Sequence, residues 1–93
     1  MINNNSEEKK MWLVKIYVTL KKGLLDAQGK ATQNALESLG FKEVEEVRMG
    51  KYINIKMKGQ NQQAVIQRVE EMGKRLLANP VIEDFNYEVE VLK

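Results

Sequence analysis

Arg48, Gly50 and Lys51 lie close together in the stretch EEVRMGKYINIK, residues 45–56, between two apolar runs rich in β-forming residues. A glycine flanked by two permanent cations could cradle a phosphate, receive a carboxylate of a protein partner, or simply turn the chain. A phosphate site needs converging backbone N–H groups or a helix N-terminus directly after the glycine. A strand pattern follows Gly50 instead, and the spacing of the Walker and dinucleotide-binding motifs is missing. Phosphate binding is therefore the least favoured of three interpretations. The other two are a solvated hairpin loop and a partner contact at which Arg48 binds a carboxylate in forked geometry.

Carboxylates occur in two further places where chemistry is conceivable. Glu83 and Asp84 are adjacent in NPVIEDF, but neighbours on an extended chain point to opposite sides and cannot share a proton. They indicate a solvated strand start or, second, a contact with a partner. Asp26 precedes a helical pattern and is expected to cap it. Because no nucleophile, base and orienting group come together, the sequence predicts a non-catalytic module.

Composition excludes several classes of protein. The 93 residues include no cysteine and no histidine, which rules out Ser-His and Cys-His triads, thiolate metal sites and disulfides. The net charge of +2 comes from 15 basic and 13 acidic residues that are well mixed, so the basic stripe of a nucleic-acid-binding protein is missing. No apolar run approaches the roughly 20 residues of a membrane span. We expect a soluble cytoplasmic protein with no metal and with neither a nucleic-acid nor a membrane partner.

Hydrophobic periodicity predicts the elements that position the candidate residues. In chain order these are a strand over 11–20, a helix that follows Asp26 and ends at Gly40, a β region over 43–58, an amphipathic helix over 64–77 with Leu76 and Leu77 on its apolar side, and a strand over 81–91. The helix stop at Asn79-Pro80 follows from the backbone restriction before proline. Residues 1–10 are polar and are expected to form a disordered tail, which leaves 11–93 as a single domain.

The β region over 43–58 admits two arrangements. A hairpin with residues 48–52 as its loop pairs Val47 with Ile53 and keeps the apolar, odd-numbered side chains on one face. A single long strand bent at Gly50 keeps the same alternation; the hairpin is favoured. The resulting β-α-β-β-α-β order predicts an α+β, ferredoxin-like fold, in which two helices cover one face of an antiparallel four-stranded sheet. The other face is expected to carry Lys15, Tyr17, Thr19, Glu88 and Glu90. A thin core with an uncovered sheet face favours a homodimer or a larger oligomer.

Three ordered blocks resemble the PurS family, the small subunits of phosphoribosylformylglycinamidine (FGAM) synthase. The blocks are GLLDAQGK at 23–30, VRMGK at 47–51 and LLANPVIEDF at 76–85, and the resemblance runs from about Trp12 to Val91. It implies a PurS-like domain in the complex that carries out the fourth step of purine biosynthesis. That complex converts formylglycinamide ribonucleotide, ATP and glutamine into formylglycinamidine ribonucleotide, ADP, phosphate and glutamate.

The resemblance also implies the partners and the division of labour. A large synthetase subunit (PurL) holds ATP, magnesium and the ribonucleotide, and a glutaminase subunit (PurQ) releases ammonia. The PurS-like subunit binds no cofactor and has no catalytic residue; it forms a homodimer or a dimer of dimers, bridges the other two subunits and supports ammonia transfer. The candidates for partner contact are Lys30, Arg48, Lys51, Glu83 and Asp84, and the structural motif positions are Gly23, Asp26, Gly29, Gly50, Asn79 and Pro80. Arg48 and Lys51 are expected to pair with carboxylates on the large subunit.

One alternative belongs to a different functional class. Small dimers with a ferredoxin-like fold also serve as sensors that bind an amino acid or a nucleotide between subunits. A sensor would be stabilised by its ligand alone, whereas a bridging subunit would be stabilised only by its protein partners.

Overall fold

The structure is a computed structural model that describes residues 10–92. Its elements are β1 (Lys10–Leu20), α1 (Ala27–Ser38), β2 (Gly50–Gly59), α2 (Gln62–Met72), a π-helical turn η2 (Gly73–Leu77) that continues α2, and β3 (Glu83–Val91). The α+β class and the antiparallel sheet are thereby confirmed. The predicted tail at residues 1–10 falls largely outside the described residues, and Lys10 is already part of β1. No helix within 10–92 is long and apolar enough to cross a bilayer.

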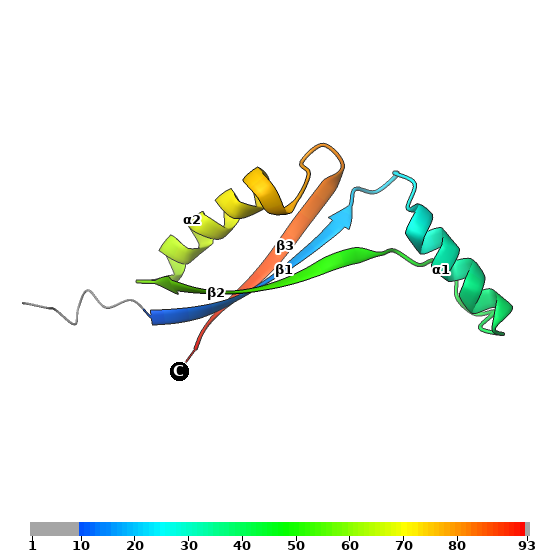
Figure 1. The fold of residues 1–93 in the computed structure, drawn as a ribbon, viewed down its shortest axis with the longest axis horizontal. Helices are drawn as coiled ribbons and strands as arrows, with labels where there is room; N and C mark the ends of the chain where they lie inside the picture. Colours follow the sequence, from blue (N-terminus) through cyan, green and yellow to red (C-terminus); the bar gives the residue numbers. More distant parts are fainter. Residues whose placement is uncertain (1–9, 93) are drawn as a thin grey trace, which may run out of the picture.

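The sheet has the order β2-β1-β3, with both neighbours antiparallel to the central strand β1. Val14 lies opposite Ile55 and Val89, so the apolar positions of all three strands share one face. Helix α2 lies across this face (Figure 1) and contributes Val65 and Val69 to the core. The buried core residues are Trp12, Val14, Ile16, Val18, Val65, Val69 and Ala78. The indole N–H of Trp12 donates to the Gly59 carbonyl at 2.9 Å, which satisfies the one polar atom of that buried ring.

The opposite face of the sheet carries the polar set expected from the sequence. Tyr17 stacks on Tyr52 with ring centroids 5.1 Å apart, and its hydroxyl lies 3.2 Å from Glu88. The Lys15 ammonium lies 3.4 Å from the Glu90 carboxylate, and this neighbour raises the pKa of Lys15 above its ordinary value. Exposed pairs of this kind add little to stability. The stability of the sheet therefore depends on the core between its other face and α2.

Helix α1 does not lie over the sheet of its own chain. The segments on either side of it, 21–26 and 39–49, leave the sheet at the same end and place α1 beyond it (Figure 1), in a molecule of 66 × 29 × 14 Å. We call residues 24–49 the arm. Of the two helices expected over one sheet face, α2 alone covers that face within the chain.

The favoured hairpin over 43–58 is wrong. β2 begins at Gly50, which lies opposite Thr19 in the ladder with β1, and residues 44–49 run outside the sheet beside α1. Gln33 Nε2 donates to the Glu45 carbonyl at 3.1 Å. The alternation of apolar residues is the same for a hairpin and for one long strand, so parity alone did not distinguish them. The structure matches neither arrangement in full: a single strand runs from Gly50 to Gly59, and residues 44–49 belong to no strand.

The end of the second helix departs from the expected pattern in one respect. The helix stops before Asn79-Pro80 as predicted, and Ala78 is already extended. The turn over Gly73–Leu77 is π-helical, however, and its wider turn rotates the following side chains relative to the α-helical face. Leu76 was expected on the apolar side and is instead 81% exposed.

Candidate functional site

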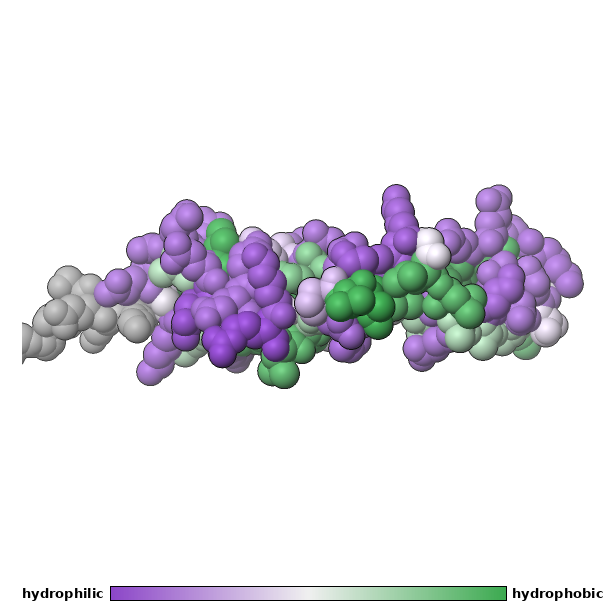
Figure 2. Space-filling model, turned by 90° about the horizontal axis from the view of Figure 1, so that it is seen from above, coloured by the Kyte–Doolittle hydropathy of each residue, from purple (hydrophilic) through white to green (hydrophobic). Residues whose placement is uncertain are grey.

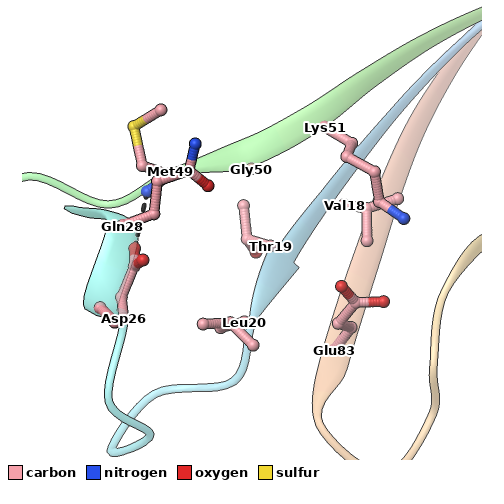
Figure 3. Close-up of a pocket in the computed structure, with 10 residues that line it drawn as sticks. Val18, Thr19, Leu20, Asp26, Gln28, Met49, Gly50, Lys51 and Glu83 are labelled. Carbon is pink, nitrogen blue, oxygen red and sulfur yellow. Dashed lines mark hydrogen bonds between the residues drawn. The ribbon is translucent and has the colours of Figure 1, made fainter.

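The three sequence blocks converge at the end of the sheet that faces the arm. Figure 3 shows the pocket there, of about 320 Å³, which is lined by Asp26 and Gln28 from the first block, Met49, Gly50 and Lys51 from the second, and Glu83 from the third, together with the end of β1. We call this region the junction. It joins the arm to the sheet. Asp26 ties the first block to the second, Arg48 ties the second to the end of β1, and Asp84 ties the third to the connector after β1.

Asp26 holds two parts of the junction together. One carboxylate oxygen accepts the Gly29 N–H at 2.8 Å and caps α1, as the sequence predicted. The other accepts the Met49 N–H at 2.7 Å, a contact that no sequence pattern indicated. The hydrogen bond from Met49, then that from Gly29, and the nearby Arg48 guanidinium lower the pKa of Asp26 below its ordinary value. The carboxylate is therefore favoured in the folded state.

The lowered pKa of Asp26 predicts an acid-sensitive junction. A group whose pKa is lower in the folded state contributes stability above its ordinary pKa of about 3.9, and that contribution is lost as the pH falls through the folded-state pKa. We expect Asp26→Asn to lower the urea unfolding free energy at pH 7, and the gap between variant and wild type to shrink at pH 3. Glu43→Gln, on an exposed residue, serves as the control and should leave the gap near zero at both pH values. An Asp26→Asn gap that is unchanged between pH 7 and pH 3 would contradict this role.

Arg48 is already bound within the chain. Its Nη2 donates to the Leu20 carbonyl at 2.7 Å and lies 3.4 Å from the Lys21 carbonyl. These carbonyls belong to the end of β1 and the connector after it, so Arg48 ties the entry into β2 to the exit from β1. A contact with a partner's carboxylate would have to use the remaining N–H groups of the same guanidinium.

The acidic block folds into a turn of its own. Asn79 Oδ1 accepts the Val81 N–H at 3.0 Å, and Glu83 Oε1 accepts the Asn79 N–H at 2.7 Å. Asp84 forms a 2.7 Å ion pair with Lys21. Glu83 lies opposite Leu20, and Asp84 lies opposite Thr19. The two carboxylates therefore point to opposite faces, as expected from their adjacency, and have separate roles in the turn.

Two of the candidate cations are accessible. Lys51 in β2 and Lys30 in α1 are exposed, and neither forms an ion pair within residues 10–92. Lys51 reaches into the pocket from the β2 side, and Glu83 from the β3 side (Figure 3). Within the part of the chain that the structure describes, no group of three or more acidic side chains is placed to hold a metal ion.

Glycines at the junction allow its parts to approach closely. A Cβ on Gly29 would lie 2.3 Å from the Val47 carbonyl oxygen, and one on Gly50 would lie 2.5 Å from that of Val18. Gly23 has a φ of 87°. The sequence reasoning missed two further packing glycines: Gly59 beneath Val65, and Gly73 against the Phe85 ring. Gly73 could have been noticed as a glycine inside a helical pattern, which usually marks a close contact.

Comparison with known proteins identifies the family. The family model of PurS, phosphoribosylformylglycinamidine (FGAM) synthase, matches residues 13–91. The chain belongs to the PurS family. The match includes all three blocks of the junction, so the PurS resemblance seen in the sequence is confirmed.

Curated relatives and solved structures agree with this assignment. The chain is 46% identical to the PurS subunit of FGAM synthase from Methanocaldococcus jannaschii, over 89% of this chain and 100% of that protein. It is 48% identical to the PurS subunit from Bacillus subtilis, over 86% of this chain and 94% of the relative. The crystal structure of the M. jannaschii PurS superposes with a TM-score of 0.80 at 43% identity, covering 88% of this chain and 99% of that one. The structure of PurLQS from Thermotoga maritima contains a chain that matches with a TM-score of 0.76 at 27% identity, covering 88% of this chain and 98% of its own.

Proposed function

We propose that this chain is the small, non-catalytic subunit of FGAM synthase and that it acts in the fourth step of purine biosynthesis. The observation that carries the proposal is the agreement over residues 13–91 with the PurS family. The match to a chain of a PurLQS structure supports a place beside a large synthetase subunit and a glutaminase subunit. In this role the subunit holds the two larger proteins in register, supports the passage of ammonia between them, binds no cofactor itself and works in the cytoplasm. ATP and magnesium belong to the large subunit.

Reconstitution with the cognate synthetase and glutaminase tests this proposal. Glutamine-dependent formation of the amidine product should fall to background when the chain is omitted. Without it the glutaminase is no longer held against the synthetase, and the ammonia that it releases is not passed on. Synthesis from added ammonium salt should persist without the chain, since it requires the large subunit alone. Full glutamine-dependent turnover in its absence, or turnover by the purified chain alone, would overturn the proposal.

The ligand-sensing alternative predicts a different outcome in a thermal-shift screen. A ligand at a concentration of 100 Kd would stabilise a sensor by about 2.7 kcal/mol. Amino acids and nucleotides are the compounds to screen, and the pocket at the junction is where we would look for them. We expect no shift with these compounds and a shift when the two protein partners are added. The reverse pattern would favour the sensor.

We propose that the exposed cation Lys51 is a partner contact, together with Arg48. Arg48 also holds the junction together, so its replacement would confound folding with assembly. Lys51→Glu avoids this problem, because Lys51 makes no ion pair within residues 10–92. Close interfacial charge pairs couple by about 1.5–7 kcal/mol, so we expect at least a tenfold weaker affinity for the large subunit with an unchanged unfolding transition.

Binding of the labelled subunit to the large subunit, followed by fluorescence anisotropy, measures the effect of Lys51→Glu. Lys42→Glu is the matched control: Lys42 is exposed and lies in the turn at the far end of the arm. Equal affinities for wild type and Lys51→Glu would remove Lys51 from the interface.

Self-association is part of the proposed function. Figure 2 shows apolar surface, in green, between the polar outer side of α2 and the polar end of the arm. The most exposed large apolar residues include Leu25 at 83% and Val81 at 78%. A chain with so thin a core and so much apolar surface gains stability by burying that surface against a second copy. We therefore propose a homodimer, or a dimer of dimers.

A further inference from the structure

Strand β3 forms an edge of the sheet, and its outer side is open. The order β2-β1-β3 places β1 on one side of β3 and no strand on the other within residues 10–92. The strand has nine residues, which corresponds to an edge of about 30 Å. An edge of this length presents a row of N–H and C=O groups that another chain can pair with.

Two hydrogen bonds beyond the ends of β3 show which of its backbone groups face outward. The Leu92 N–H donates to the Met11 carbonyl at 2.8 Å, and the Lys21 N–H donates to the Ile82 carbonyl at 2.9 Å. The even-numbered residues therefore direct their backbone groups towards β1. Because successive residues of a strand alternate in this respect, the odd-numbered residues direct theirs to the open side. They are Glu83, Phe85, Tyr87, Val89 and Val91.

The middle of this open edge is the part that can accept a strand. The Glu83 N–H is already used, because it donates to the Asn79 carbonyl at 2.7 Å. The outward backbone groups of Phe85, Tyr87 and Val89 have no partner within the described part of the chain. An antiparallel strand can exchange two hydrogen bonds with each of these three residues.

Charge selects the strand that the edge can bind. The sequence of β3, EDFNYEVEV, contains four acidic residues and no basic one. Asp84 and Glu90 form ion pairs with lysines of the chain, whereas Glu83 and Glu88 form none among residues 10–92. Charges on an edge strand oppose pairing with a strand of like charge. The same charges favour a basic segment.

A pocket lies at the start of this edge. It has a volume of about 480 Å³ and is bounded by the end of α2, the first residues of β3 and the turn that joins η2 to β3 (Figure 1). Pro80 and Phe85 give it apolar walls. A long cationic side chain fits such a pocket, because its stem is apolar and its head is charged. Three carboxylates and two ammonium groups line the pocket, from Glu70, Glu83, Asp84, Lys21 and Lys74.

Glu70 in α2 is placed to bind the head of that side chain. Its Oε2 accepts the Tyr87 hydroxyl at 2.7 Å, while its Oε1 lies 3.9 Å from the Lys74 ammonium, too far for a hydrogen bond. Oε1 is therefore available to a cation. The Phe85 ring lines the same pocket. Arginine suits this pair, because its planar guanidinium stacks on aromatic rings and donates several N–H groups to carboxylates.

We propose that the open edge of β3 binds an extended, basic segment of a partner protein as an antiparallel strand, with an arginine opposite Phe85 that reaches Glu70. Side chains directly opposite each other share a face of the sheet, so this arginine lies on the same side as Phe85 and the pocket. The backbone then supplies affinity, and the pocket supplies specificity. The proposal does not depend on which enzyme the chain serves.

A second copy of the chain is the rival occupant. Its own β3 is acidic, so two β3 edges repel each other. Its strand β2, GKYINIKMKG, carries three lysines and no acid. A contact between β3 of one copy and β2 of the next would repeat head to tail into an open chain of copies rather than close. A basic segment of another protein has no such consequence.

A short peptide tests the edge directly on the full chain. The probe is fluorescein-labelled KVKVTRT, whose two valines and arginine fall opposite Val89, Tyr87 and Phe85 in the proposed register and whose lysines lie on the face of Glu88. Fluorescence anisotropy measures its Kd. Citrulline in place of the arginine removes the charge at nearly constant shape, and N-methylation of the second valine removes a backbone donor. Each change should weaken binding about tenfold or more. A peptide that does not bind at millimolar concentration, or that is indifferent to both changes, would overturn the proposal.

Glu70→Gln tests the pocket from the side of the protein. Glutamine retains an oxygen that can accept the Tyr87 hydroxyl, so the fold should persist, which circular dichroism checks. We expect affinity for KVKVTRT to fall about tenfold or more. Glu71→Gln is the matched control, with the same charge change on the same helix, because the Glu71 carboxylate binds Arg68 and Arg75 instead. It should change the affinity less than about twofold. Equal losses for the two variants would reduce the effect to overall charge and overturn the pocket.

Hydrogen exchange followed by NMR locates the bound peptide. In the free chain the outward amides of Phe85, Tyr87 and Val89 should exchange fast, and those of Glu88 and Glu90, which face β1, should exchange slowly. Saturating KVKVTRT should slow the three outward amides about tenfold or more. Protection confined to β2 or to the junction would overturn the proposal. Slow exchange of the three outward amides in the free chain, growing with protein concentration, would assign the edge to a second copy instead.

Discussion

Replacing Ile16 by alanine should lower the unfolding free energy by about 2–5 kcal/mol, the range observed for large aliphatic side chains in closed cores. Ile16 is 0% exposed and lies at the centre of β1, opposite Ile53 on one side and Tyr87 on the other. Because β1 is paired with a strand on each side, its backbone cannot move into the cavity that alanine leaves. Most of this loss of unfolding free energy should therefore be measured. At the usual stability per residue, a domain of 93 residues has a total unfolding free energy of only about 5–14 kcal/mol.

Leu76→Ala is the matched control for Ile16→Ala. Leucine and isoleucine are isomers, so both substitutions remove the same three carbon atoms, but Leu76 is 81% exposed. We expect its effect to stay within about 0.5 kcal/mol. Urea unfolding followed by circular dichroism at one fixed protein concentration measures both, since self-association makes stability depend on concentration. Similar losses for the two variants would place the core elsewhere.

Replacing Gly29 by alanine should destabilise the protein by about 1–3 kcal/mol, the usual cost of overpacking. Helix propensity taken alone predicts the opposite sign, a gain of about 1 kcal/mol, because alanine is the best helix former. The added Cβ would lie 2.3 Å from the Val47 carbonyl oxygen and 2.6 Å from Asp26 Oδ2. A backbone carbonyl cannot rotate away as a side chain can. The arm must therefore open, with loss of the hydrogen bonds that Asp26 makes to Gly29 and Met49.

Asn34→Ala in the same helix separates packing from propensity. Asn34 is exposed in α1, so alanine there should gain up to about 0.7 kcal/mol from propensity. Gly29→Ala and Asn34→Ala are predicted to change the unfolding free energy in opposite directions, which a urea unfolding series measures directly. Hydrogen exchange of the α1 amides should quicken in Gly29→Ala and slow in Asn34→Ala. A Gly29→Ala variant more stable than wild type would show that α1 does not pack on segment 44–49.

Local chemistry accounts for the site residues that could be predicted from the sequence. Asp26 caps α1 because a short acceptor precedes a helical run, and Asn79-Pro80 ends the second helix because proline restricts the residue before it. Glu83 and Asp84 point to opposite faces because they are neighbours on a strand. The second hydrogen bond of Asp26 and the two carbonyls beside Arg48 lie more than 20 residues away along the chain, and no local pattern reports a contact of that range.

The sequence by itself determined the period of the elements, the order of the two helices and of the three strands that form, the residues on each face of β1 and the family to which the chain belongs. Those features depend on side-chain alternation and on motif residues, which can be read without knowing what lies beside them. Only the tertiary structure decided where segment 44–49 and α1 go, because Val47 and Ile53 share a face equally well in a hairpin and in one straight strand. That choice is made by contacts distant in sequence: Asp26 with Met49, Arg48 with the Leu20 carbonyl, and the close approach of Gly29 to Val47.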